Sequence, residues 1–224
     1  MTRNRTRWQL AGGIIAAPLF FTVAFAQAFA REGFDIKQHM ISQLATGDLA
    51  WIQIANFVTV GILYILCAAG MRQLLSPAHG GTWGPRLIAT FGAGLVAAGV
   101  FVTDPAGGYP PATVSGGPSW HGIAHGVAAM VAGLALVAAI AVFAWRFATL
   151  KEKGWAIFSA VIGMVYFALP FTNSDLGGLP LAVASLVGWG WISILATRLT
   201  FQHGAIQQPN RHPSTPAPMV SSHG

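Results

Sequence analysis

Long apolar runs alternate with short segments rich in Gly, Pro and polar residues along most of the chain. Six of these runs have lengths near the roughly 20 residues that an α-helix needs to cross a bilayer core of about 30 Å. Lipid offers backbone amides no hydrogen-bonding partner, so the amides must pair within each run, which favours helices. The pattern predicts an all-α polytopic membrane protein, a six-transmembrane-helix bundle, with spans near residues 8–29, 51–71, 87–102, 123–145, 155–171 and 179–199.

The composition excludes an ordinary soluble protein. Only 8% of the 224 residues are charged and 54% are hydrophobic, with a mean hydropathy of +0.59, whereas soluble domains have about 25% charged residues. We therefore expect a multi-pass protein of the cell membrane, with the lipid bilayer as its surroundings. Trp189 and Trp191 fall inside the last run and should pack within the bundle. The small residues Gly92, Gly94 and Gly99 of the third run should allow close helix packing.

The basic residues indicate the orientation of the bundle. Of the twelve Lys and Arg residues, only Arg31 and Lys37 fall in the odd-numbered connections between spans. Because cytoplasmic segments carry the excess of Lys and Arg, both termini should be cytoplasmic. The net charge of +6 then serves topology, and we expect no nucleic-acid partner. The other ten basic residues are Arg3, Arg5, Arg7, Arg72, Arg86, Arg146, Lys151, Lys153, Arg198 and Arg211.

Two regions follow from this pattern. Residues 1–200 should form the six-helix transmembrane domain, and residues 201–224 should form a disordered cytoplasmic tail. The end of the chain is rich in Pro and Ser and has no apolar periodicity, a composition that cannot bury enough apolar surface to order itself.

The acidic residues point to the extracytoplasmic side as the place for any chemistry. Five of the six fall there, and only Glu152 is on the cytoplasmic side. In the first external segment, Ile36, Met40, Ile41 and Leu44 recur at helical spacing, which predicts a short helix lying on the membrane. The alternative is a solvated amphipathic connector. The five external acids are Glu32, Asp35, Asp48, Asp104 and Asp175.

A histidine pair opens the fourth span. His121 and His125 are four residues apart, so their imidazoles share one helix face, a spacing that suits joint ligation of a metal. Zinc takes three or four protein ligands, so His39, Asp104 or Asp175 would have to complete the site. Asp104 at the end of the third span and Ser42 in the first external segment complete the candidate set. The alternative is that the two histidines hydrogen-bond to groups at helix ends.

Four stretches carry a family resemblance: "GFDIKQHMISQLATGDLAWIQIANF", "RLIATFGAGLVAAGVFVTDP", "SWHGIAHG" and "FTNS". In these stretches the chain resembles a bacterial and archaeal membrane family known as domain of unknown function 998, over roughly residues 10 to 200. The resemblance implies a six-helix integral membrane protein and brings no established activity with it.

A more distant likeness concerns residue types only. Membrane-embedded zinc hydrolases of the alkaline ceramidase and progestin-receptor superfamily use a Ser, an Asp and three His near helix ends, although they have seven spans and a different order of motifs. This chain offers the same types on one side of the membrane. The residues are Ser42, Asp104, His39, His121 and His125.

Three functions stay open at this point. In a metal-dependent hydrolase of lipid-like substrates at the outer leaflet, His39, His121 and His125 would hold Zn²⁺, whose bound water becomes nucleophilic near neutral pH. Asp104 would orient that water or act as a base, and Ser42 would donate a hydrogen bond to the developing oxyanion. The alternatives are a non-catalytic membrane scaffold and a small-solute or proton-coupled transporter, the latter disfavoured because the span centres are almost wholly apolar.

Overall fold

The computed structural model describes residues 2–78, 80–113, 116–172 and 177–205. These residues form six α-helices and two short 3₁₀-helices, and within the described ranges there is no strand. Five of the helices are long and apolar enough to cross a membrane. The elements in chain order are α1 (Thr2–Ala30), η1 (Ile41–Ala45), α2 (Ala50–Leu75), α3 (Trp83–Val100), α4 (Trp120–Thr149), α5 (Lys153–Ala168), η2 (Leu169–Phe171) and α6 (Leu179–Ala205).

These bounds follow the apolar runs of the sequence closely. The last helix continues beyond the predicted end at residue 199 and reaches Ala205, so the first residues assigned to the tail are helical. The remaining predicted tail, residues 206–224, and Asp175 lie outside the described residues.

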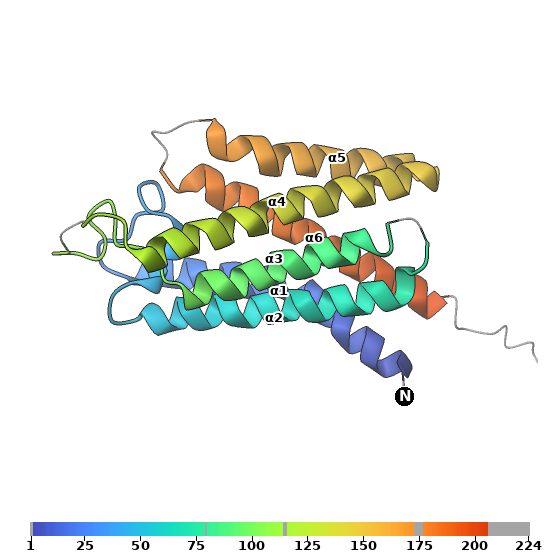
Figure 1. Ribbon diagram of the computed structural model, residues 1–224, viewed down its shortest axis with the longest axis horizontal. Helices are drawn as coiled ribbons and strands as arrows, with labels where there is room; N and C mark the ends of the chain where they lie inside the picture. The colour runs from blue at the N-terminus through green and yellow to red at the C-terminus, as the bar shows by residue number, and fades with distance from the viewer. Residues whose placement is uncertain (1, 79, 114–115, 173–176, 206–224) are drawn as a thin grey trace, which may run out of the picture.

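The helices run up and down and pack on their sequence neighbours, and α1 also packs on α6. Figure 1 shows the segments 31–49, 101–113 and 116–119 together at one end of the bundle, which we call the loop end. The N-terminus, the α2–α3 and α4–α5 turns and the end of α6 lie at the opposite, terminal end (Figure 1). α4 and α6 make little direct contact with each other, and this separation shapes the site described below.

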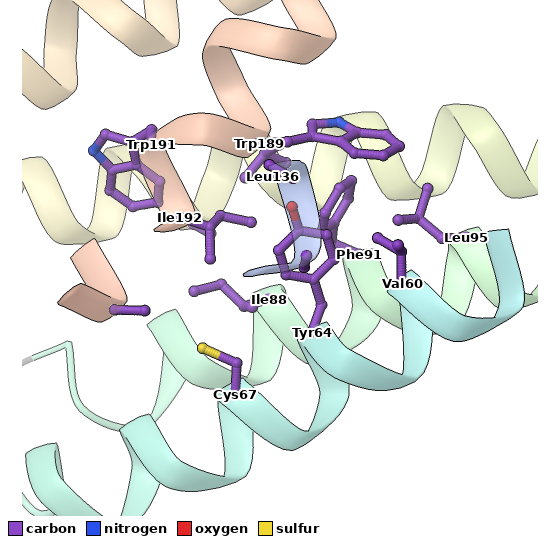
Figure 2. Packing of buried hydrophobic residues seen from close by; sticks show 14 of the residues in the cluster. Val60, Tyr64, Cys67, Ile88, Phe91, Leu95, Leu136, Trp189, Trp191 and Ile192 are labelled. Atoms are coloured by element: carbon purple, nitrogen blue, oxygen red, sulfur yellow. The ribbon is translucent and has the colours of Figure 1, made fainter. Parts of the chain in front are cut away.

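Aromatic side chains form the centre of the bundle. Trp189 of α6 is 5% exposed, and its ring lies 4.5 Å from that of Phe20 and 5.3 Å from that of Phe91, measured between centroids. Figure 2 shows Trp189, Phe91 and Tyr64 converging from three helices. Trp191 is 1% exposed and donates to the Ser159 hydroxyl at 3.1 Å. The prediction that both tryptophans pack inside is confirmed.

Glycines bring neighbouring helices into backbone contact. A Cβ built at Gly92 of α3 would lie 2.6 Å from the Gly61 carbonyl oxygen of α2, and one at Gly61 would meet the Gly92 oxygen at the same distance. On its other side, α3 touches α4, where a Cβ at Gly94 would lie 2.7 Å from that of Ala132. Real side chains do not approach so closely, so these glycines allow the contact, as the sequence predicted.

The first loop-end segment differs from the expected surface helix. Residues 36–38 form a turn, residues 39 and 40 are irregular, and only Ile41–Ala45 are helical, as the 3₁₀-helix η1. Ile41 is 8% exposed and Leu44 is fully buried, so η1 packs into the bundle instead of lying on its surface. The helical spacing was misleading because a short apolar segment can bury its side chains by tertiary packing alone.

Candidate functional site

His39 joins the first loop-end segment to the second. Its Nδ1 accepts a hydrogen bond from the Asp35 backbone N–H at 2.9 Å, so Nε2 carries the proton and donates to the Gly107 carbonyl, also at 2.9 Å. The side chain is 3% exposed and lies against the rings of Phe34 and Tyr109. Gly107 has a φ of +65°, which a glycine adopts without strain. Both imidazole nitrogens are therefore engaged within the protein.

Asp104 holds the beginning of α4. The Ser119 hydroxyl donates to Oδ1 at 2.5 Å and the Ser119 N–H donates to Oδ2 at 2.9 Å, while the same hydroxyl accepts from the Gly122 N–H at 3.0 Å as an N-cap. The bond from the hydroxyl, with the bond from the backbone and the nearby His121, holds the pKa of the Asp104 carboxyl below its ordinary value. A side chain at Gly122 would overlap this carboxylate.

His121 and His125 contact the end of α3. Nδ1 of His125 lies 2.9 Å from the carbonyl oxygens of both Ala98 and Phe101, and Nδ1 of His121 lies 2.8 Å from that of Val102. Carbonyls only accept hydrogen bonds, so Nδ1 is the protonated nitrogen in each ring. The last carbonyls of a helix lack partners within it. His125 donates to those of Ala98 and Phe101 at the end of α3, and His121 donates to that of Val102, just after the helix. This is the arrangement expected if they serve helix-end groups.

Arg31 organises the first loop-end segment. One terminal nitrogen donates to the Leu44 carbonyl at 2.6 Å and the Thr46 carbonyl at 3.3 Å. The other donates to Gln27 Oε1 at 2.6 Å and to the Leu49 carbonyl. The sequence singled out Arg31 only as an exception to the charge pattern, because a guanidinium that binds backbone carbonyls has no sequence signature.

The three histidines are not gathered into one ligand set. Within the described ranges, no group of three or more His, Cys, Asp or Glu side chains is arranged to hold a metal ion. His39 has no free ring nitrogen, and His121 and His125 each direct Nδ1 to a backbone carbonyl at or just after the end of α3. Zinc ligation by His39, His121 and His125 therefore stays a prediction without geometric support. Of the predicted catalytic pair, Asp104 is engaged by Ser119.

Ser42 and His125 both line a cavity of about 310 Å³ between α4 and α6. Three aromatic rings from α1, α2 and α3 form part of its wall, and residues 40–42 line it from the loop-end segment. The Tyr166 hydroxyl of α5 also lines it, 3.7 Å from a Cβ built at Gly133. The principal lining residues are Phe20, Phe57 and Phe91; Met40, Ile41 and Ser42; Gly122, His125, Gly126, Ala129 and Gly133; Tyr166; and Leu181, Ala182, Ser185 and Trp189.

The cavity exists because α5 is shorter than the helices beside it. α4 has 30 residues and α5 has 16, which correspond to lengths of about 45 Å and 24 Å. Tyr166, close to the end of α5, lies level with Gly133 of α4. The half of α4 nearer the loop end therefore faces α6 across a gap, and Gly126 and Ala129 remain exposed there.

A comparison with protein families gives one match. A family model described as "Protein of unknown function (DUF998)" matches residues 14–198. The chain belongs to the DUF998 family. No curated protein and no solved structure matches the chain significantly. The matched DUF998 region begins within α1 and ends within α6, so it includes every residue that lines the cavity.

One pattern in the sequence of this DUF998 protein is related to the cavity. Gly122, Gly126, Ala129 and Gly133 recur at spacings of four, three and four, which places them on one face of α4. A face of small residues predicts either close helix packing or space. Gly126 has no atom within 4 Å of a built Cβ, whereas Gly94 has Ala132 at 2.7 Å, so only the fold distinguishes the two cases.

Proposed function

We propose that this DUF998 protein spans the cell membrane six times with both termini in the cytoplasm, and that its cavity binds a lipid-like molecule of the outer leaflet. The proposed binding of a lipid-like molecule rests on the open, largely apolar cavity between α4 and α6. Its volume of about 310 Å³ falls at the lower end of the range typical of ligand sites, about 300–1,000 Å³.

The connections of the chain support six spans. α2 ends at the terminal end and α4 begins at the loop end, so the chain must return across the bundle between them, and α3 is the segment that does so. With 18 residues, α3 is about 27 Å long, close to the roughly 30 Å of a bilayer core. The basic residues gather at the terminal end, which supports a cytoplasmic location for that end.

The position of the cavity supports a ligand taken from the bilayer. The outward faces of α4 and α5 carry exposed apolar side chains, among them Met130 at 58%, Leu134 at 55% and Met164 at 70% exposure. Such a surface faces lipid in a membrane. Gly126 and Ala129 are exposed between this surface and α6, so an acyl chain reaches the cavity from the bilayer without crossing water.

Photolabelling of the protein in liposomes tests the binding site. The probes are a fatty alcohol and the matching fatty acid, each with a diazirine in the chain, and labelled peptides are mapped by mass spectrometry. We expect either probe to label the α4 segment around Gly126 and Ala129 and the α6 segment around Ser185.

A matched pair of variants separates the cavity from general lipid contact. Gly126 and Gly190 both lie inside helices with no atom within 4 Å of a built Cβ, but only Gly126 lines the cavity. Gly126→Leu should abolish labelling of the α6 segment, and Gly190→Leu should leave it unchanged. If the α6 segment is labelled equally in both variants, the cavity is not the lipid-binding site.

Cysteine labelling tests the orientation. The chain has one cysteine, Cys67, and it is buried, so the wild-type background is silent. Gly117 and Gly154 lie near opposite ends of α4 with open space around a built Cβ. A membrane-impermeant maleimide should label Gly117→Cys on intact cells and Gly154→Cys only after permeabilisation, and the reverse result contradicts the orientation.

A further inference from the structure

We infer that the cavity selects a single-chain lipid with an uncharged, hydrogen-bond-donating head such as a hydroxyl, which donates to Nε2 of His125. This inference rests on the proposed function, because it names the chemical class that the same cavity takes.

The charge of the lining excludes a charged head. Among the residues of ranges 2–78, 80–113, 116–172 and 177–205 that line the cavity there is no Lys, Arg, Asp or Glu. A carboxylate or phosphate moved from the membrane surface into this site would lose its hydration without gaining a counter-ion, which is costly at membrane depth. The polar side chains that line the cavity carry hydroxyl groups or nitrogen-containing rings. The residues with a hydroxyl include Ser42, Thr103 and Ser185.

The tautomer of His125 indicates which kind of polar head fits. Nδ1 is shared between two carbonyl oxygens of α3 at 2.9 Å each and must carry a proton. In the neutral ring Nε2 is then an acceptor, and it makes no hydrogen bond to the described residues. The side chain is 6% exposed and lines the cavity. A ligand hydroxyl supplies the missing donor, whereas an ester or an ether does not.

The dimensions of the cavity indicate one chain and not two. Its lining extends along α4 from Gly122 to Gly133, a rise of about 16 Å. An elongated space of this size takes a head and the first part of one chain, and the rest of a longer chain extends into the bilayer.

Competition among three ligands of equal chain length tests the selection on the wild-type protein. Dodecanol, dodecanoate and methyl dodecanoate compete with the photoreactive alcohol for labelling of the α6 segment, at pH 8, where ordinary carboxyl groups are ionised. Of the three, only dodecanol has a head group that is uncharged and can donate a hydrogen bond. We expect it to compete at a concentration about tenfold lower than either of the others, the factor for one hydrogen bond of typical net strength.

The outcomes separate this inference from the proposed function. Equal competition by all three, or stronger competition by dodecanoate, overturns the selection and leaves the cavity as a lipid site. Absence of labelling by both photoreactive probes overturns the proposed function itself. His125→Phe keeps a ring in the cavity and removes the acceptor, so the advantage of the alcohol over the ester should disappear while labelling persists. If His125→Phe does not fold, the competition among the three ligands on the wild-type protein is the test of the selection.

Discussion

Replacing His39 with Ala should destabilise the protein without affecting metal content, because His39 acts as a connection between two loop-end segments. The change removes both hydrogen bonds of a 3% exposed ring and leaves the Asp35 N–H and the Gly107 carbonyl without their partner. An unsatisfied buried group costs about 1–3 kcal/mol. Water reaches part of the vacated space, so we expect the lower part of the sum, about 2–4 kcal/mol.

Thermal unfolding in detergent measures this loss. For a protein of about 150–250 residues, 1 kcal/mol lowers the Tm by about 2–4 °C, so His39→Ala should lower it by about 4–16 °C. His121→Ala is the matched control from the same predicted ligand set. The His121 side chain is 43% exposed and makes one hydrogen bond to a carbonyl, so its removal costs about 0.5–1.5 kcal/mol and the shift should be smaller.

A metal chelator distinguishes a structural His39 from a zinc ligand. With the structural role, EDTA leaves the Tm of the wild-type protein unchanged. If EDTA lowers the wild-type Tm to that of His39→Ala, His39 is a metal ligand, which refutes the structural role. A Tm for His39→Ala within about 1 °C of wild type would equally refute it, since the two hydrogen bonds would then contribute too little to detect.

Three further changes test the packing and the electrostatics. Unfolding in SDS should show that Gly92→Ala destabilises the bundle by about 1–3 kcal/mol through overpacking. In the same assay Gly190→Ala, whose added methyl group meets open space, should be neutral or stabilising. Glu152→Gln should cost about 1–3 kcal/mol because Glu152 binds Arg198 at 2.6 Å through both oxygens, and a Tm equal to wild type would contradict this. The folded pKa of Asp104 lies below its ordinary value of 3.8, so its carboxylate contributes stability above that pH and loses the contribution as pH falls through the folded pKa. The Tm difference between wild type and Asp104→Asn should therefore shrink below about pH 4, and a difference that grows there would contradict the assignment.

The helices were predictable from the sequence because each is marked locally. An apolar run such as 51–71 must be helical in lipid whatever its neighbours are, and α2 occupies Ala50–Leu75. The interior positions of Trp189 and Trp191 were predictable for a related reason, since an amphipathic side chain placed mid-span cannot reach the interface.

The site was less predictable because its contacts join residues far apart in the chain. His39 and Gly107 are 68 positions apart, and no periodicity indicates that an imidazole will bind that carbonyl. The spacing of His121 and His125 suits two metal ligands, and it equally suits two rings that bind carbonyls at and just after the end of α3. Spacing fixes which face of a helix a side chain occupies, and the neighbouring helix determines its partner.

The cavity depends on the length of α5, which the sequence indicated only weakly. The fifth apolar run is among the shortest, and a short helix leaves the loop-end half of α4 uncovered. Whether α6 then closes on the glycine face of α4 or stands apart depends on Tyr166, whose ring a side chain at Gly188 would overlap. Such a spacer between two helices follows from three-dimensional packing and not from composition.

An experimental structure of the protein in lipid nanodiscs would show directly whether the space between α4 and α6 holds a lipid-like chain. We expect elongated density beside Gly126 and Ala129, with one end next to His125. A structure in which α6 packs directly on the glycine face of α4, with no space between them, would contradict this expectation.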